Sequence, residues 1–273
     1  MIALLCSSLI LNTCRLGLGD ENTQPEPRLI SSLSGFVVRM ISAGVNHTLA
    51  ITNAGDIFSW GSDRFGQLGY GGGDAGKGSL SPRKIDSLKK SVVVAIAAGD
   101  AHSVCFTDDG EIYSWGCNKD GQLGVPLLER GGGMGGGSGS CIPKRVHMKG
   151  SKMTVQSGRE NKFQSMKVRS PLLQIVASKS STLLLRRPDE YDSAKGNGRF
   201  LTQVNEVYQW GHGSHIPSRV MFNRGAVTHS GGTDPAMDRF FGHHTVAPID
   251  IVQLSAGQYH NVALSSMGHV YTW

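Results

Sequence analysis

Histidines are the residues of this sequence whose type most readily supports acid–base catalysis or metal binding. His47, His102 and His260 each stand thirteen residues before a tryptophan. An active site is not copied into every repeat, so this regular spacing favours a structural role, with each buried ring making one hydrogen bond to a neighbouring unit or turn. The pair His212 and His215 has no carboxylate or cysteine at ligand spacing, and we expect no metal site.

Other catalytic and cofactor patterns are incomplete. Residues Gly71 to Gly78 approach the phosphate-binding pattern G-x-x-x-x-G-K-S/T, but Gly78 stands where the hydroxyl belongs and Pro82 follows where a helix must grow. The sequence has no G-x-S-x-G and no H-E-x-x-H motif, and its carboxylates are scattered through turns. We therefore expect neither an enzyme nor a bound cofactor.

The elements that carry the histidines repeat along the chain. Each of the four tryptophans ends a phrase of an aliphatic residue, an aromatic residue, any residue and Trp. Gly55, Gly110 and Gly268 fall eight residues after a repeat histidine, between two apolar runs. The spacing predicts a strand after the histidine, a hairpin turn at the glycine and a second strand that ends at the tryptophan.

Further motifs recur at fixed offsets from the same histidines. A glycine stands three residues before each one, Gly-Gln-Leu-Gly follows two of the tryptophans, and a Pro-x-x-aliphatic step follows at Pro27, Pro82, Pro143 and Pro217. The segment Leu16 to Asp20 is similar to the end of a Gly-Gln-Leu-Gly motif. The residues of the repeat motif are Gly44, His47, Gly55, Trp60, Gly61, Gly66, Gly69, Gly99, His102, Gly110, Trp115, Gly116, Gly121, Gly124, Trp210, Gly211, Gly257, His260, Gly268 and Trp273.

One copy of the repeat is degenerate. Ser178 replaces the glycine and Ser181 replaces the histidine, and Trp210 lies 29 residues after Ser181 instead of thirteen. An insertion at roughly 186–201, at the tip of the hairpin, accounts for the difference, because surface turns accept insertions at small entropic cost.

These motifs, in this order, resemble the repeat of the regulator of chromosome condensation family. The resemblance implies an all-β fold, a seven-bladed β-propeller. Only about four blades fit this sequence, and Trp273 stops within a Trp-Gly phrase, so we expect an incomplete propeller with long flexible insertions. Trp210 to Gly213, with no Gly-Gln-Leu-Gly after it, resembles ankyrin- and BTB-containing relatives similar to the inhibitor of Bruton tyrosine kinase.

The boundaries follow from the motifs. We expect an N-terminal segment of uncertain structure at 1–15 and a partial propeller at 16–273. Its repeat units are about 16–61, 62–116, 117–211 and 212–273, with insertions at about 127–141, 147–170, 186–201 and 223–245.

Positive charge is concentrated in one predicted insertion. The formal net charge is +6, and the segment Ile142 to Ser170 holds Glu160 as its only acidic residue. Such a basic loop could contact nucleic acid, chromatin or anionic lipid, or it could be a solvated insertion that keeps the protein soluble. The candidate basic patch comprises Lys144, Arg145, Lys149, Lys152, Arg159, Lys162, Lys167 and Arg169.

Cysteine usage favours a reducing, intracellular compartment, either cytoplasm or nucleus. The five cysteines are odd in number and show no C-x-x-C spacing, which supports neither a disulfide framework nor a zinc site. The apolar start of the chain lacks a preceding basic residue and an Ala-x-Ala cleavage site, so a secretory signal is not expected. It is also too short to span a bilayer.

Two classes of function follow from these observations. The first is a non-enzymatic protein–protein interaction scaffold, part of a larger regulatory protein, with partner specificity in its variable insertions. The alternative, implied by the family resemblance, is a guanine-nucleotide exchange factor for a small GTPase or a chromatin-associated adaptor. No segment of this sequence matches the β-wedge of the family's exchange factors, and a shared fold does not carry that activity with it.

Overall fold

The computed structural model describes residues 15–74, 76–126, 139–148, 172–187, 204–222 and 249–273. This part of the chain contains fifteen strands in four antiparallel sheets, three short 3-10 helices and no α-helix. The predicted all-β fold is therefore confirmed.

Each sheet is one blade, and its strands pair in sequence order. The first blade comprises β1 (Val38–Ala43), β2 (His47–Thr52), β3 (Ile57–Gly61) and β4 (Ser79–Lys84). The second comprises β5 (Val93–Ala98), β6 (His102–Thr107), β7 (Ile112–Cys117) and β8 (Gly139–Arg145). The third comprises β9 (Leu172–Ala177), β10 (Ser181–Arg186), β11 (Glu206–Gly211) and β12 (Ser214–Arg219), and the fourth β13 (Ile251–Ala256), β14 (Asn261–Ser265) and β15 (Val270–Thr272). The 3-10 helices are η1 (Ser31–Leu33), η2 (Gly72–Asp74) and η3 (Asp86–Leu88).

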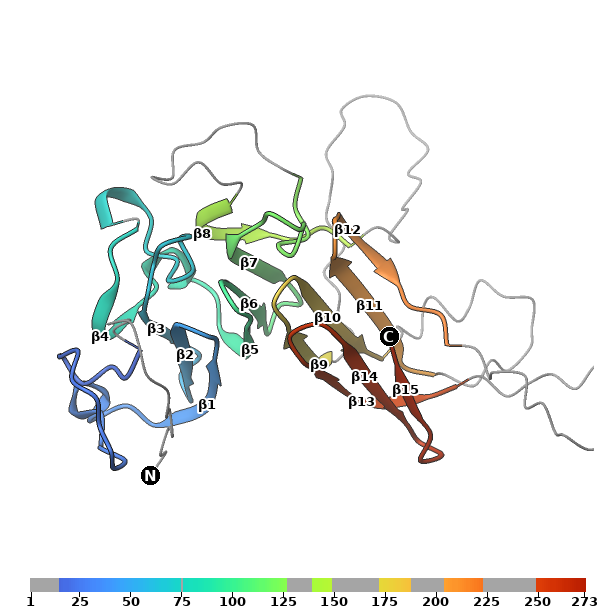
Figure 1. The fold of residues 1–273 in the computed structure, drawn as a ribbon, viewed down its shortest axis with the longest axis horizontal. Coiled ribbons are helices and arrows are strands. Elements are labelled where there is room, and N and C mark those ends of the chain that lie inside the picture. Colours follow the sequence, from blue (N-terminus) through green and yellow to red (C-terminus); the bar gives the residue numbers. More distant parts are fainter. Residues whose placement is uncertain (1–14, 75, 127–138, 149–171, 188–203, 223–248) are drawn as a thin grey trace, which may run out of the picture.

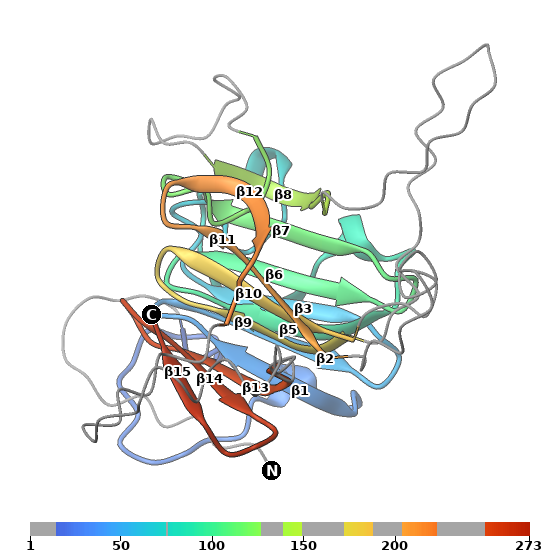
Figure 2. The ribbon, with the colours of Figure 1, turned by 90° about the vertical axis from the view of Figure 1, so that its right-hand side faces the viewer.

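The four blades form an open arc (Figure 1). The first strands of consecutive blades contact one another, β1 with β5, β5 with β9 and β9 with β13, so they lie innermost. Figure 2 shows the outer strands β8 and β12 at the top, with the other strands of the second and third blades below them. The propeller architecture implied by the family resemblance is confirmed, and the described blades do not close into a ring.

The blades are staggered relative to the sequence repeat. A unit such as 62–116 supplies the fourth strand of one blade and the first three strands of the next. The tryptophans lie on the third strands, or just after β15 in the case of Trp273, rather than on inner strands. Residues 139–141 and Arg186, placed in insertions by the sequence, belong to β8 and β10.

The hydrophobic core lies between blades rather than within them. One cluster joins Leu49 and Ile51 of the first blade to Val93 and Cys105 of the second. A second cluster joins the second and third blades, and a third joins the third and fourth. Each blade therefore buries its apolar surface only against a neighbour, as expected of a repeat architecture.

A chain of hydrogen bonds, here called the histidine relay, crosses the first joint between blades. The buried His47 Nε2 lies 2.9 Å from Ser103 Oγ, and that hydroxyl donates to the carbonyl oxygen of Gln67 at 2.8 Å. Because the hydroxyl proton is used on Gln67, the imidazole must carry its own proton on Nε2 and donate it to Ser103. The indole N–H of Trp115 donates to the same carbonyl at 2.8 Å.

The second joint repeats the histidine and hydroxyl bonds, but its Trp210 indole N–H is buried and has no hydrogen-bond partner among the described residues. His102 Nε2 lies 3.0 Å from Thr182 Oγ1, which donates to the carbonyl oxygen of Gln122 at 3.0 Å. His47 and His102 therefore each make a hydrogen bond from one blade to the next.

Glycine makes the relay geometrically possible. A Cβ on Gly99 would lie 2.3 Å from His102 Cε1 and 2.3 Å from the carbonyl oxygen of Ser178 in the next blade. Gly44 is confined in the same way by His47 and by the carbonyl of Gly99. The glycine three residues before the histidine therefore permits both the ring and the neighbouring blade to approach.

The Gly-Gln-Leu-Gly loops cap the tryptophans of the following blades. Gly69 packs on the Trp115 indole and Gly124 on the Trp210 indole, each with a positive φ. Gly17 packs on Trp60 in the same way, and Arg15 supplies the carbonyl oxygen for the Trp60 N–H at 2.9 Å. Residues 15–19 thus act as the end of a Gly-Gln-Leu-Gly motif, as the sequence predicts.

The third joint lacks the relay. Ser181 occupies the histidine position and bonds Ser178 within its own blade, with 2.8 Å between the two hydroxyl oxygens. Asn261 stands where Ser103 and Thr182 stand in the other joints, and its buried Oδ1 has no hydrogen-bond partner among the described residues. Two bonds between Gln174 and the Leu254 backbone, of 2.7 and 2.8 Å, join these blades instead.

Removal of a relay histidine tests this account. His102→Ala should lower the free energy of unfolding by about 2–4 kcal/mol, because it leaves a cavity and removes a buried hydrogen bond. His260→Ala changes the equivalent residue of the fourth blade, whose ring is exposed, and should lower the free energy of unfolding by less than about 0.5 kcal/mol. Equal losses for the two variants in urea unfolding would contradict a role for the relay.

The relay also predicts a dependence of stability on pH. Burial lowers the pKa of His47 to about 4 and that of His102 to about 3, below the value near 6.5 of the unfolded chain. Their Nδ1 atoms are buried and have no hydrogen-bond partner among the described residues, so a second proton on these rings is unfavourable. Their contribution to stability is full above pH 6.5 and is lost as the pH falls towards 4.

Urea titrations at several pH values measure this loss. Burial raises the pKa of Asp63 to about 6, so this carboxyl contributes in the opposite direction over the same range, and the comparison is best made in an Asp63→Asn background. There the free energy of unfolding should fall between pH 6.5 and 4.5, and it should fall less when both relay histidines are replaced by alanine. A slope unchanged by that replacement would show that the histidines are not its source.

Candidate interaction surface

The repeat-motif residues serve the blade joints rather than a binding site. Trp60, Trp115 and Trp210 are at most 1% exposed, and the hairpin glycines Gly55 and Gly110 have positive φ as the turns require. His260 and Trp273 differ because they lie on the exposed fourth blade, where the Trp273 indole N–H donates to Gln209 Oε1 at 2.7 Å.

Only part of the predicted basic patch lies within the described residues. Lys144 and Arg145 are on β8, and Arg145 pairs with Glu111 just before β7, with a 2.6 Å hydrogen bond. The first and third blades repeat this pair as Lys84 with Asp56 and Arg219 with Glu206. The other six patch residues, Lys149, Lys152, Arg159, Lys162, Lys167 and Arg169, lie outside the described part of the chain.

The two ends of the strands define two faces of the arc. The hairpin face carries the turns at Gly55, Gly110 and Gly268, and the described residues that flank 149–171, 188–203 and 223–248 all leave strands at this end. The histidine face carries the loops that precede each second strand and follow each third strand. Three of the four predicted insertions therefore start from one face.

Two groups of cations and aromatic rings lie on the histidine face. The Phe65 ring, in the loop after β3, lies 5.6 Å from the Arg64 guanidinium of the same loop. It also lies 5.4 Å from the Lys119 ammonium in the loop after β7, so the loops of the first and second blades meet here. Lys179 of the third blade lies 4.6 Å from the Tyr259 ring of the fourth and donates to its hydroxyl at 2.8 Å. That hydrogen bond raises the pKa of Lys179, which stays charged.

Such pairs are suited to protein recognition. Tyr259 is 71% exposed and Lys179 is also exposed, although each belongs to a loop that a rigid blade holds. Tyrosine and arginine are enriched where protein interfaces concentrate their binding energy. Sequence reasoning missed these residues, since the partners come from different blades and only folding brings them together.

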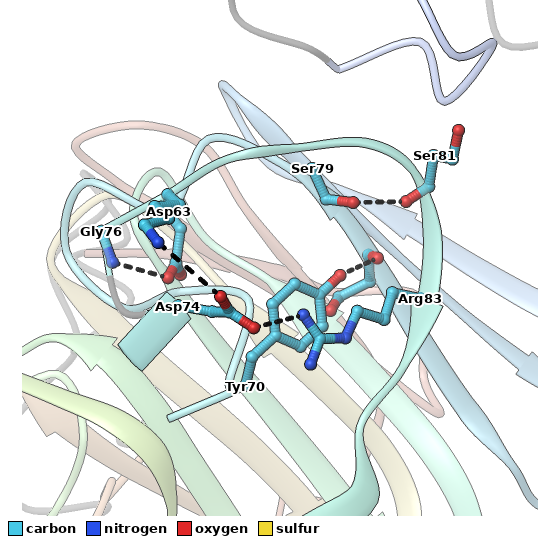
Figure 3. Close-up of polar contacts among 9 residues, drawn as sticks. Asp63, Tyr70, Asp74, Gly76, Ser79, Ser81 and Arg83 are labelled. Carbon is cyan, nitrogen blue, oxygen red and sulfur yellow. Dashed lines mark hydrogen bonds and ion pairs between the residues drawn. The ribbon is translucent and has the colours of Figure 1, made fainter. Parts of the chain in front are cut away.

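A polar cluster anchors the long loop of the first blade (Figure 3). Asp63 is nearly fully buried and accepts backbone hydrogen bonds from Leu68 at 2.8 Å and Gly76 at 3.0 Å. Asn118 occupies the same position in the second blade and accepts from Leu123 at 3.0 Å. Asp63, whose pKa is raised by burial, therefore anchors the loop. A residue with a side-chain oxygen stands two residues after Trp-Gly in both blades, and this signal was available in the sequence.

The outer part of the same cluster is exposed. Arg83 donates to Asp74 at 2.8 Å and lies 4.5 Å from the Tyr70 ring, and the Tyr70 hydroxyl donates to the Ser59 carbonyl at 2.5 Å. The hydrogen bond from Arg83 lowers the pKa of Asp74. These groups close the loop on itself, and each side chain is already engaged within the cluster.

The described residues contain no group of three or more histidine, cysteine, aspartate or glutamate side chains placed to hold a metal ion. None of their helices is long and apolar enough to cross a membrane. Cys105, Cys117 and Cys141 are free thiols.

The chain is similar to several known proteins. It is 27% identical over 260 residues to the mitochondrial RCC1 domain-containing protein RUG3 of Arabidopsis thaliana, which covers 95% of this chain and 47% of that protein. It is 31% identical over 182 residues to human RCC1 domain-containing protein 1, which covers 65% and 45%. The chain thus spans about half the length of these relatives.

The structure agrees with this likeness. Human WBSCR16 superposes with a TM-score of 0.55 at 18% identity, over 86% of this chain and 47% of that one, which indicates a shared fold. The comparisons do not support the finer resemblance to ankyrin- and BTB-containing relatives of the inhibitor of Bruton tyrosine kinase.

The family model described as the regulator of chromosome condensation (RCC1) repeat matches residues 12–51, 54–106 and 109–161, more than half of the chain. The matched segments contain the relay histidines, the capped tryptophans and the Gly-Gln-Leu-Gly loops of the first two blades. The chain therefore belongs to the regulator of chromosome condensation repeat family.

Proposed function

We propose that the chain is a non-enzymatic scaffold for protein partners, part of a larger regulatory protein. The observation that carries this proposal is that the buried polar residues hold the blades and loops together, whereas other polar residues are exposed on one face. The buried histidines and Asp63 are engaged in joints and loops, whereas the cation–aromatic pairs of the histidine face are exposed. Exposed pairs on rigid loops supply directional contacts without a large entropic cost of ordering.

Family membership suggests two alternative functions for the same surface, guanine-nucleotide exchange and binding to chromatin. Guanine-nucleotide exchange on a small GTPase needs a surface that binds the GTPase more tightly without nucleotide, and a chromatin adaptor role needs contact with histones or DNA. Contact of the basic segment with nucleic acid or anionic lipid also stays a proposal, as does an intracellular location in cytoplasm or nucleus. The absence of enzymatic activity likewise stays a prediction.

Substitutions on the histidine face test the scaffold proposal. Tyr259→Ala combined with Lys119→Glu should weaken binding of partners captured by the full-length protein by at least tenfold, since central aromatic contacts cost about 2 kcal/mol or more when truncated. Lys89→Glu with Lys90→Glu changes exposed lysines next to η3 and should leave affinity within about twofold. Calorimetry or biolayer interferometry gives both affinities.

The same capture experiment separates the alternatives. Recovery of a GTPase in its nucleotide-free form, with accelerated nucleotide release by the chain, would replace the scaffold reading with exchange activity. Unchanged affinity for the histidine-face variant, together with loss of binding in the lysine variant, would place the partner on the hairpin face and contradict the assignment of this surface.

A further inference from the structure

The outer strands of the first three blades carry the same bulge. Residues 80–82 of β4 lie opposite Trp60 alone, because three residues of β4 stand where β3 has one. Residues 141–143 of β8 and 215–217 of β12 occupy the same place in their blades. A serine precedes each bulge, and its hydroxyl donates to the carbonyl oxygen of the middle bulge residue at 2.6, 2.7 and 3.4 Å. The three bulges are therefore equivalent.

The middle residue of the bulge differs in the first blade. Ile142 and Ile216 hold this position in the second and third blades, whereas Ser81 holds it in the first. Ile142 packs against Gly71 in a loop of the first blade, where an added Cβ would lie 2.4 Å from its Cγ2. The half-buried Ser81 makes no such apolar contact, and its hydroxyl has no hydrogen-bond partner among the described residues. The structural repeat therefore does not account for this hydroxyl.

The residues that follow Ser81 suit recognition by a protein kinase. Pro82 has no N–H and holds the preceding residue in an extended conformation, so a kinase site that offers no acceptor for that N–H selects proline. Arg83 and Lys84 then present two cations to an acidic kinase subsite. Lys84 Nζ lies 2.6 Å from Asp56 Oδ1, and a surface pair of this kind exchanges partners at little cost.

The bulge is also accessible from outside the blade. In the described structure β4 pairs with β3 on one side only, as the outer strand of its sheet. Residues 76–78, which lead into β4, and Arg83, which follows the bulge, are exposed. In Figure 3 the Ser81 side chain points away from the polar cluster of the first blade. A kinase can therefore approach Ser81 without opening the sheet.

Ser81 lies beside the segment that caps Trp60. The Gly19 N–H donates to the Leu80 carbonyl oxygen at 3.0 Å, and a Cβ added to Gly19 would lie 3.6 Å from Ser81 Oγ. Asp20 is the next residue of this segment. A group added to the Ser81 hydroxyl thus meets a close backbone contact and a segment that carries negative charge.

We propose that Ser81 is a phosphorylation site for a proline-directed protein kinase, and that the phosphate releases residues 15–19 from the first blade. Ser81 Oγ attacks the γ-phosphorus of ATP, the bond from that phosphorus to the bridging oxygen breaks, and ADP leaves. The hydroxyl proton passes to the catalytic carboxylate of the kinase. The phosphate carries about −1.5 to −2 charges at neutral pH, so it crowds Gly19 and repels Asp20.

Release of residues 15–19 uncovers Trp60. Its indole N–H donates to the Arg15 carbonyl oxygen at 2.9 Å, and Gly17 packs on the ring. Both contacts come from the released segment, whereas the bond from His47 to the second blade does not involve it. Phosphorylation therefore loosens the cap of the first blade and leaves the joint to the second blade intact.

A kinase reaction on the native chain tests the site. The kinase is a purified proline-directed enzyme that prefers a basic residue three positions after the serine, and fragmentation mass spectrometry locates the phosphate. We expect phosphate on Ser81 in the wild type and none at this position in Ser81→Ala. Lys84→Ala should slow modification of Ser81 by at least about tenfold. It should not slow modification of Ser170, which also precedes a proline but has three uncharged residues after it.

Hydrogen exchange of the phosphorylated chain tests the release. In a Ser170→Ala background, phosphate on Ser81 should speed exchange of the Gly19 amide by at least about tenfold and leave the amides of β5 and β6 unchanged. Ser81→Ile restores the aliphatic residue of the other blades, and its Gly19 amide should exchange no faster than that of the wild type.

Two results would overturn the proposal. The first is a native chain that the kinase does not modify at Ser81, whether or not it modifies a synthetic peptide of residues 77–88. The second is a chain phosphorylated at Ser81 whose Gly19 amide exchanges at the rate of the unmodified protein.

Discussion

A buried imidazole must find a hydrogen-bond partner without water, and each relay histidine finds it on the following blade. His47 and His102 donate to a hydroxyl that in turn donates to a loop carbonyl, and that carbonyl belongs to the loop that caps the next tryptophan. Removing the hydroxyl leaves the imidazole buried and unpaired, which costs more than the bond itself contributes. The glycine three residues before each histidine makes room for the imidazole, and the tryptophan packs on the loop that supplies the carbonyl oxygen. The order of the motifs along the chain reflects these contacts.

The third joint shows what happens when the contact is absent. Without a histidine, the glycine that made room for it is no longer required, and Ser178 stands in its place. The Gly-Gln-Leu-Gly loop is missing from the same repeat, and Trp273 is left 37% exposed. These are coordinated changes, because the loop, the histidine and the glycine act only together. The fourth blade is joined instead by the two bonds between Gln174 and the Leu254 backbone and by the third hydrophobic cluster.

Local features of this fold could be predicted from sequence, and features made by distant residues could not. Gly55, Gly110 and Gly268 were predictable as hairpin turns, and the role of His47 and His102 was predictable from their spacing. Their acceptors were not, because Ser103 and Thr182 lie 56 and 80 residues away. The stagger of unit and blade was hidden for the same reason, since strand pairing decides it. Lys119 on Phe65 and Lys179 on Tyr259 show the same limit on the candidate surface.

Hydrogen exchange of the native protein tests most directly whether the relay holds the blades together. The first and fourth blades both lie at ends of the described arc, but only the first is joined to its neighbour through a relay histidine. The amides of β1 and β2 should exchange with a higher opening free energy than those of β13 and β14. Equal protection of the two blades, or stronger protection of the fourth, would contradict the account.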